Sequence, residues 1–243
     1  YPHTWDTVDR ENGVVVGVPH TPDPVLFGIR GESPAWVKEA RSYVLSEETA
    51  CEQVYVTNQG TDAHLIPGSA ATLREGRSYL VRGTVAEAAS TGPGGHVSFL
   101  LDDCGAVVRC MAYEPTKGFR RVVRALVPGD VVAAAGSYKG GSLNLEKLGV
   151  ARLADAVLVR PPVCPACKKR MTSAGTDKGY KCRVCGERSR EPETARIERH
   201  LEPGWYEVPP TARRHLARPL ARGVAAWEEE VLHSDQECRP SSG

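Results

Sequence analysis

The chain has 243 residues, enough for about two domains. Its 41% hydrophobic and 25% charged residues are ordinary for a globular protein, which excludes a disordered or fibrous chain. The start, YPHTWDTVDR, has no features of a secretory leader, and no run of about 18 apolar residues occurs, so we expect a cytoplasmic protein without a membrane span. The net charge is only +1, but nine Lys and Arg against two acids fall between Arg160 and Arg190. This asymmetry indicates a polyanionic partner such as nucleic acid, or alternatively a solvated basic face.

Residues 1–66 have the pattern of part of a mixed α/β domain. Short apolar runs predict strands at 13–18, 24–31 and 51–58. Ser33 is a suitable N-cap and Pro34 suits the first helical position, so a helix is predicted over 33–44.

Five strand-like runs and one helix follow a linker-like stretch at 67–77. The runs are 78–88, 96–103, 106–114, 130–139 and 142–150, and most are separated by turn residues. Between the third and fourth runs, helical spacing occurs at 117–127. This order is typical of an OB-fold barrel, although a different small barrel or a sandwich is an alternative.

Four of the eight cysteines form two CxxC pairs with the spacing C-x2-C-x14-C-x2-C. They are Cys164, Cys167, Cys182 and Cys185. Two such knuckles place four thiolates around one ion, the closed ligand set of structural rather than catalytic zinc. The sequence therefore predicts a zinc ribbon, with iron as the main rival metal.

Aromatic and basic residues of the barrel could contact nucleic acid. Met111 and Tyr113 are candidates for base stacking, whereas Phe99 is expected in the core. Candidate backbone contacts are Arg82, Arg109, Lys139 and Lys147. Arg120, Arg121 and Arg124 on the predicted helix could do the same or form its solvated face.

The stretch TNQGTDAHL (57–65) gathers Asn58, Gln59, Asp62 and His64 within one turn. Such a cluster could close a functional pocket. The alternative is a turn in which Asn and Asp side chains bond their own backbone. No phosphate-binding loop, nucleophile elbow or zinc-protease motif accompanies it.

Several segments taken together resemble one known family. They are WDTVDRENG (5–13), DPVLFGIRGE (23–32), TNQGTDAHL (57–65), LLDD (100–103), MAYEPT (111–116), LVPGDVV (126–132), LNLEKL (143–148) and the CPAC…CRVCG pair. This set is similar to the archaeal 2-agmatinylcytidine synthetase family, which modifies the minor isoleucine tRNA. The resemblance covers about residues 5–220.

The resemblance implies a four-part enzyme with a kinase-like catalytic domain, a ferredoxin-like domain, an OB-fold and a zinc ribbon. It implies the C-terminal part of the ferredoxin-like domain at 1–66, a tRNA-binding OB-fold at 67–157, the ribbon at 158–190 and a C-terminal extension at 191–243. We do not expect the catalytic domain within this chain, so no catalytic residue is named. Structural zinc is expected here, and ATP with Mg²⁺ in the full-length enzyme.

The implied activity is that of an ATP-dependent ligase. It attaches agmatine to C2 of the first anticodon cytidine of the minor isoleucine tRNA, so that CAU reads AUA codons. Agmatine carries a guanidinium and an amine, so Glu32 and Asp62 are candidates to bind it, and Arg30 and His64 to bind RNA phosphate. Asn58 and Gln59 complete this group. The expected tRNA contacts are Lys168, Lys169, Arg170, Lys178, Lys181, Arg183, Arg213 and Arg214.

Two other functions fit the same elements. One is a non-enzymatic protein that uses an OB-fold and a zinc ribbon to bind single-stranded nucleic acid. The other is a small zinc-stabilised subunit whose basic patches face a protein partner. Residues 1–66 argue against the plain single-strand binder, which does not need them.

Overall fold

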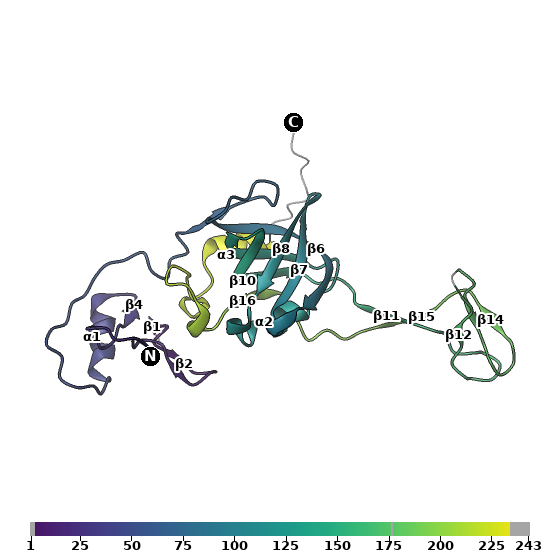
Figure 1. Cartoon of the computed structure of the whole chain (residues 1–243), viewed down its shortest axis with the longest axis horizontal. Coiled ribbons are helices and arrows are strands. Elements are labelled where there is room, and N and C mark those ends of the chain that lie inside the picture. The colour runs from purple at the N-terminus through teal and green to yellow at the C-terminus, as the bar shows by residue number, and fades with distance from the viewer. Residues whose placement is uncertain (1–2, 176, 234–243) are drawn as a thin grey trace. The chain divides into compact units, whose positions relative to one another are not determined.

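The computed structural model describes residues 3–175 and 177–233 (Figure 1). They form two compact units. The barrel unit joins the residues before Ala154 to those after His200, and the ribbon unit is Ala154–His200. Among the described residues, no helix has the length and hydropathy needed to cross a membrane.

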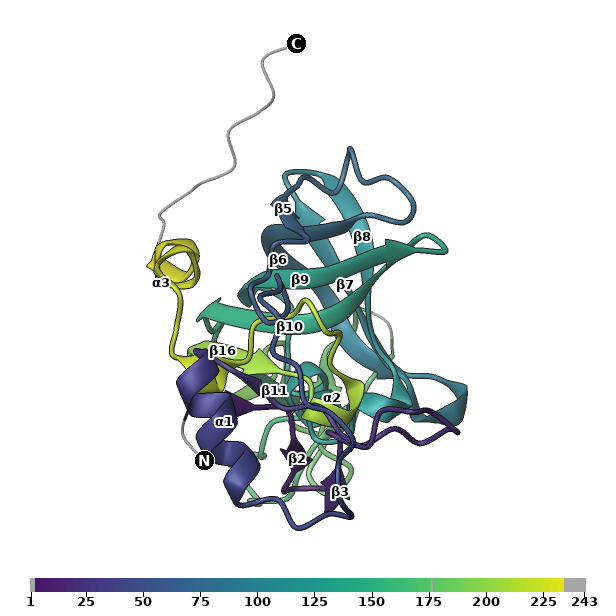
Figure 2. The ribbon, with the colours of Figure 1, turned by 90° about the vertical axis from the view of Figure 1, so that its left-hand side faces the viewer.

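A closed five-stranded barrel forms the centre of the barrel unit (Figure 2). Its strands are β6 (Ser78–Thr91), β7 (Val97–Asp103), β8 (Ala106–Ala112), β9 (Val131–Lys139) and β10 (Ser142–Arg152). They pair in the order β6–β7–β8–β10–β9, and β9 returns to β6, with β8 and β10 parallel and the other pairs antiparallel. Helix α2 (Phe119–Arg124) lies between the third and fourth strands, so the predicted OB-fold order is confirmed.

The interior of the barrel contains small aliphatic residues, as the low aromatic content predicts. Val81, Leu101, Val132 and Leu143 are fully buried. Phe99 is 2% exposed and therefore belongs to the core rather than to a stacking surface. Cys110 is also fully buried, and this burial raises the pKa of its thiol.

The first segment of the barrel unit contains one helix and short strand pairs. Helix α1 (Pro34–Ser42) begins as predicted, with the Ser33 side chain accepting a hydrogen bond from the Trp36 amide. The strands are β1 (Thr4–Trp5), β2 (Val8–Asp9), β3 (Val14–Val15), β4 (Arg30–Gly31) and β5 (Leu65–Pro67). β1 pairs with β4, β2 with β3, and β5 with β6 of the barrel.

The predicted strand at 51–58 is wrong, because the structure has no strand there. Apolar residues form a stable strand only beside a neighbour that takes their backbone hydrogen bonds. Val54, Tyr55 and Val56 are instead exposed, and Val56 is 98% exposed.

The residues after 191 divide between the two units. β15 (Glu193–Arg196) pairs with β11 (Val157–Arg160) in the ribbon unit. β16 (Gly204–Glu207) pairs with β10 of the barrel, and helix α3 (Ala226–His233) packs near β10. The segment from β16 to α3 therefore belongs to the barrel unit's packing.

The ribbon unit contains a three-stranded antiparallel sheet. Its strands are β12 (Thr172–Ser173), β13 (Tyr180–Lys181) and β14 (Arg188–Ser189). Its small buried core consists of Cys164, Met171 and Cys182, with Tyr180 packed against them. A mixed α+β chain with a barrel and a ribbon is the fold class that the sequence predicts.

Candidate metal centre and nucleic-acid interface

The two CxxC pairs of the ribbon unit form knuckles of the same geometry. In the first, the Cys164 amide donates to the Lys169 carbonyl at 2.8 Å, and in the second, the Cys182 amide donates to the Glu187 carbonyl at 2.8 Å. Lys168 and Gly186, each directly after its pair, have positive φ angles of 56° and 81°. This turn reverses the chain, so both thiols of each pair point the same way.

The four thiols converge on one point. Their Sγ atoms all lie within 4.8 Å of one another, and the distances Cys164–Cys185 and Cys167–Cys182 are 3.4 Å and 3.3 Å. Four thiolates around zinc with bonds of about 2.3 Å would be about 3.8 Å apart, so the arrangement fits a tetrahedral metal site. Backbone amides of Cys185 and Val184 lower the pKa of Cys182 to about 6, which favours the thiolate form.

Basic side chains of the ribbon project into solvent. The exposed residues among the predicted RNA contacts are Lys168, Lys169, Arg170, Lys178, Lys181 and Arg183. Arg170 is partly engaged, because it donates to the Pro161 carbonyl at 2.7 Å and pairs with Glu193 at 3.2 Å. The others form an accessible cationic surface next to the metal centre.

Asp62 is held in a buried charge cluster rather than in an open pocket. The Lys147 ammonium lies 2.6 Å from Asp62 and 2.7 Å from Glu228 of α3. These three side chains are between 0% and 3% exposed, and the Trp227 ring lies beside the ammonium at 5.6 Å. The other Asp62 oxygen accepts the Arg218 amide at 2.7 Å.

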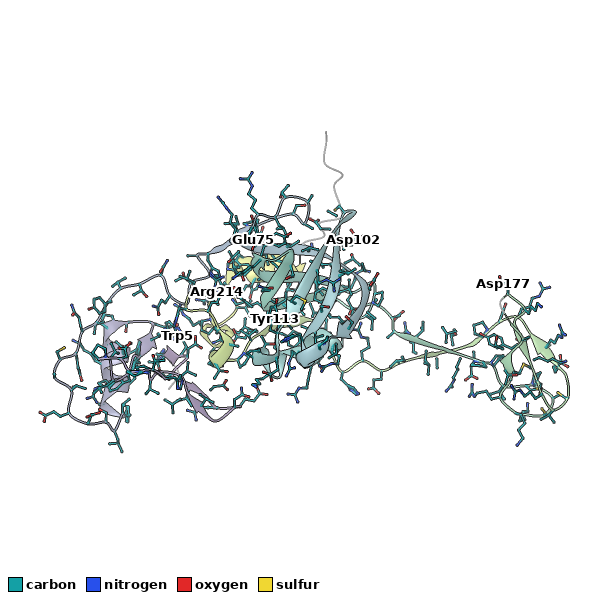
Figure 3. The ribbon with its side chains drawn as sticks, in the orientation of Figure 1. Trp5, Glu75, Asp102, Tyr113, Asp177 and Arg214 are labelled. Carbon is teal, nitrogen blue, oxygen red and sulfur yellow. The ribbon has the colours of Figure 1, made fainter. Side chains whose placement is uncertain are left out.

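His64 lies two residues further along and is also bonded to the barrel. Its Nε2 is 2.8 Å from a carboxylate oxygen of Glu146, which neighbours Lys147 in β10. The second Glu146 oxygen accepts from Arg214 at 3.0 Å, and Arg214 also donates to Ser78. Figure 3 shows Arg214 on the side of the barrel that faces the first segment.

The backbone around the motif is bonded to the C-terminal segment. The Gly60 amide donates to the His215 carbonyl at 2.8 Å, and the Asp62 amide donates to the Leu216 carbonyl at 2.9 Å. The motif is thus held neither as an open pocket nor as a turn that bonds only to itself. It joins β10 to the residues before α3.

The remaining candidates of the first segment lie together at its junction with the C-terminal segment. Arg30 donates to the Gln59 side chain at 2.6 Å and also contacts His215. Glu32 is exposed and lies 3.4 Å from Arg222. Asn58 is exposed, and its carbonyl accepts from Thr61.

Arg213 is enclosed by two acids, so its guanidinium does not face solvent. It pairs with Asp6 and, at 2.6 Å, with Glu207, and its side chain is 5% exposed. Burial raises the pKa of Asp6 and of Glu207, and Arg213 opposes both shifts. The prediction that Arg213 contacts RNA does not fit this position.

The partners that hold Asp62 and His64 could not be predicted from the motif itself. Leu143 and Leu145 face the barrel interior, so strict alternation would turn Lys147 inward as well, yet Lys147 points outward, where α3 and the motif cover it. A register shift in β10 between Leu145 and Lys147 lets Glu146 and Lys147 both serve as anchors. The available sequence signal for these anchors is the pair of adjacent charged residues, Glu146 and Lys147, within the apolar run LNLEKLGV.

Comparisons with known proteins match this architecture. Models of the TiaS FLD domain and of the TiaS C-terminal zinc ribbon domain match residues 1–64 and 161–201. The isoleucine-tRNA 2-agmatinylcytidine synthetase TiaS of Methanosarcina mazei is 51% identical over 226 residues, which cover 91% of this chain. The chain belongs to the tRNA 2-agmatinylcytidine synthetase family. The homologue of Archaeoglobus fulgidus is 46% identical over 91% of the chain.

Solved synthetase structures have the same fold. The complex of TiaS with its isoleucine tRNA and ATP superposes with a TM-score of 0.82 at 43% identity, over 93% of this chain and 54% of that one. The complex of TiaS with the tRNA, AMPCPP and agmatine superposes with a TM-score of 0.78 at 40% identity, over 99% and 54%. This chain spans about half the length of the synthetases it matches, 52% of the M. mazei protein.

Proposed function

We propose that this chain is the tRNA-holding portion of an ATP-dependent ligase. The whole enzyme attaches agmatine to C2 of the first anticodon cytidine of the minor isoleucine tRNA, so that CAU reads AUA codons. The observation that supports this most strongly is the 51% identity to a synthetase over 91% of the chain. A plain single-strand binder would not need the segment that matches the FLD model.

The role of this chain follows from the cost of presenting the target base. Taking a base out of its stack costs a few kcal/mol. Contacts to the rest of the tRNA can offset that cost, and RNA arms are held mainly through phosphates and 2′-hydroxyl groups. The exposed lysines and arginines of the ribbon suit this task. ATP and Mg²⁺ belong to the whole enzyme, and we assign no catalytic residue to this chain.

We infer that the four cysteines hold a structural zinc ion. Four thiolates leave no open coordination position for chemistry, and the knuckle geometry fits a tetrahedron. The metal would fix the ribbon as a rigid support for its basic side chains.

The first-segment candidates divide into two groups by their surroundings. Arg30, Glu32, Asn58 and Gln59 are partly or fully exposed and remain candidates for contact with agmatine or tRNA. Asp62 and His64 are bonded to Lys147 and Glu146, so we assign them to positioning of the segment. Arg214 is about half exposed and can still reach RNA with its remaining donors.

A binding experiment tests the tRNA role. The chain should bind a transcript of the minor isoleucine tRNA with an affinity that falls steeply as salt rises, because each neutralised phosphate releases counterions. The change Lys168→Glu with Lys169→Glu should weaken binding while the zinc content, measured by elemental analysis, stays at the wild-type level. Lys38→Glu on α1 provides an exposed control. Indifference to salt, or equal affinity for DNA of the same sequence, would contradict the proposal.

A labelling experiment tests the chemistry. Radiolabelled agmatine, ATP and the tRNA are supplied to this chain joined to the half of a synthetase that it does not cover. The label should enter the CAU-anticodon tRNA and remain absent from other isoleucine tRNAs. Label in neither tRNA, with binding intact, would favour the non-enzymatic alternative.

A further inference from the structure

A basic hollow lies between the first segment and the barrel helix α2. Its volume is about 310 Å³. Glu11 and Asn12, between β2 and β3, form one wall, and the other residues come from α2 and the turn before it: Lys117, Gly118, Arg120, Arg121 and Arg124. Four cationic side chains thus surround one space. They lie far along the chain from the predicted RNA contacts on the ribbon.

The cationic side chains have hydrogen-bond donors that are not used within the described part of the chain. Arg120 donates to the Gly95 carbonyl at 2.5 Å, its side chain is 18% exposed, and its Nε has no hydrogen-bond partner in the described part of the chain. Arg124 donates only Nε to Thr91, at 3.3 Å, in the bonds that the structure records. Lys117 and Arg120 both pair with Glu114, at 3.0 Å and 3.4 Å. Arg120 is therefore fixed in place, while Arg121 and Arg124 are exposed and adjustable.

Glu11 is the acid that faces these cations across the hollow. Its carboxylate lies 3.5 Å from Arg121, and the two side chains are 66% and 77% exposed. An ion pair with this distance and this exposure contributes little to stability, so another anion can replace the carboxylate. Gly118 permits the approach, because a Cβ there would lie 3.0 Å from the Glu11 oxygen.

The chemistry of the lining selects the class of ligand. Guanidinium groups bind phosphate oxygens through paired N–H donors. The lining has no apolar side chain, whereas a protein partner would normally bury an apolar centre.

An exposed aromatic ring accompanies the cations. Tyr113, labelled in Figure 3, precedes the turn that leads to α2. Its ring lies edge-on against that of His96, with the ring centroids 5.1 Å apart. Tyr113 is 38% exposed. An exposed ring that precedes a phosphate site in the chain can stack on an unstacked base of the same RNA strand.

We propose that this hollow binds a backbone phosphate of the tRNA and that Glu11 occupies the position of the phosphate in the free chain. The proposal rests on the proposed function and adds a contact at α2 to those expected on the ribbon. Glu11 then tunes the affinity by competing with the RNA for Arg121.

Two variants with opposite expected effects on tRNA affinity test the site in the whole 243-residue chain. The change Arg121→Glu with Arg124→Glu should weaken binding of the tRNA about tenfold or more and reduce the slope of log K against log salt by about 1–2. Glu11→Gln should strengthen binding about two- to threefold, because it removes a competing carboxylate and keeps the shape. Arg152→Glu, at an exposed position at the end of β10 and outside the lining of the hollow, is the charge-reversal control and should change the affinity little.

The outcomes separate this site from the proposed function. If the wild-type chain binds tRNA and neither α2 nor Glu11 variants alter the affinity, the hollow is not a phosphate site, while the tRNA role stands. If the wild-type chain binds no tRNA, both fail. If poly-glutamate binds as tightly as tRNA and loses the same affinity in the double variant, the site takes an acidic protein instead. Circular dichroism melting confirms that each variant is folded.

Discussion

At the scale of single residues, the role of Lys147 in the structure differs most from the role that the sequence predicts. As a lysine on a barrel strand it is a candidate phosphate contact, yet its side chain is 1% exposed and bonded to two carboxylates. The second oxygens of Asp62 and Glu228 accept the amides of Arg218 and Ala225. One ammonium and two backbone amides thus balance two buried acids, and the cluster joins three parts of the barrel unit.

Removing the ammonium should be strongly destabilising. Lys147→Met leaves two buried carboxylates without their cation, so we expect the free energy of unfolding to fall by about 3–5 kcal/mol. Lys139→Met, at the exposed end of β9, should cost about 0–1 kcal/mol. Urea unfolding followed by circular dichroism measures both. Equal small losses would show that the cluster does not stabilise the unit.

Asp6 gives a pH dependence with a defined sign. Burial raises the pKa of Asp6 above the ordinary value of 3.8, against the attraction of Arg213. The folded state therefore binds this proton more tightly than the unfolded state, and the stability it contributes at low pH is lost as pH rises through the raised pKa. The stability advantage of the wild type over Asp6→Asn should shrink from pH 4 to pH 7. Urea unfolding at several pH values checks it, and an advantage that grows with pH would contradict it.

At the scale of elements, closure of the barrel depends on close backbone approaches. Gly136 in β9 pairs with Tyr79 of β6 and Leu145 of β10. A Cβ at this position would lie 2.0 Å from the Asn144 carbonyl oxygen, which is backbone and cannot move aside. Glycine here lets β9 bend between its two neighbours.

Gly136→Ala should therefore weaken the barrel. We expect a loss of about 1–3 kcal/mol in the free energy of unfolding, the range for an overpacked position. Gly92→Ala is the matched control, because its Cβ would meet nothing nearer than 4.0 Å and its φ is −90°. Thermal unfolding of both variants distinguishes them, and equal melting temperatures would rule out a closure role for Gly136.

The elements that could be predicted from sequence are those whose signals are local. The five barrel strands are bounded by their own turns, and the cysteine knuckles depend on a few adjacent residues. The wrong strand at 51–58 and the burial of Lys147 depend on neighbours far along the chain. In the buried charge cluster, Lys147 is 85 residues away from Asp62 and 81 residues away from Glu228. No local sequence pattern encodes a contact between residues so far apart along the chain.

At the scale of the whole molecule, the chain divides into a barrel unit and a ribbon unit. The ribbon unit's own core consists of two thiol ligands, one methionine and a tyrosine. So small a core gives little stability, and such units usually depend on their metal for folding. The barrel core has no such dependence, since it is made mainly of aliphatic residues.

Removing the metal should therefore unfold one unit only. Treatment with a zinc chelator is expected to abolish the ordered amide signals of residues 161–190 in heteronuclear NMR spectra, while the barrel signals keep their positions. Cys182→Ser should have the same effect without chelator. Loss of the barrel signals together with those of the ribbon would show that the two units fold as one.

A deletion where the ribbon unit connects to the barrel unit tests whether the two units have separate roles in folding and tRNA binding. The Ile197 amide donates to the Ala156 carbonyl at 2.8 Å, so residues 157–196 can be replaced by a short Gly-Ser turn that joins Ala156 to Ile197, two residues that are already hydrogen-bonded to each other. We expect the barrel's melting temperature to stay unchanged and the zinc to be lost. Affinity for the tRNA should fall about tenfold or more with a shallower salt dependence, because the exposed lysines of the ribbon no longer neutralise phosphates. Calorimetry and filter binding measure the two effects. An unfolded barrel would refute the independence of the units, and an unchanged affinity would place the tRNA contacts on the barrel unit alone.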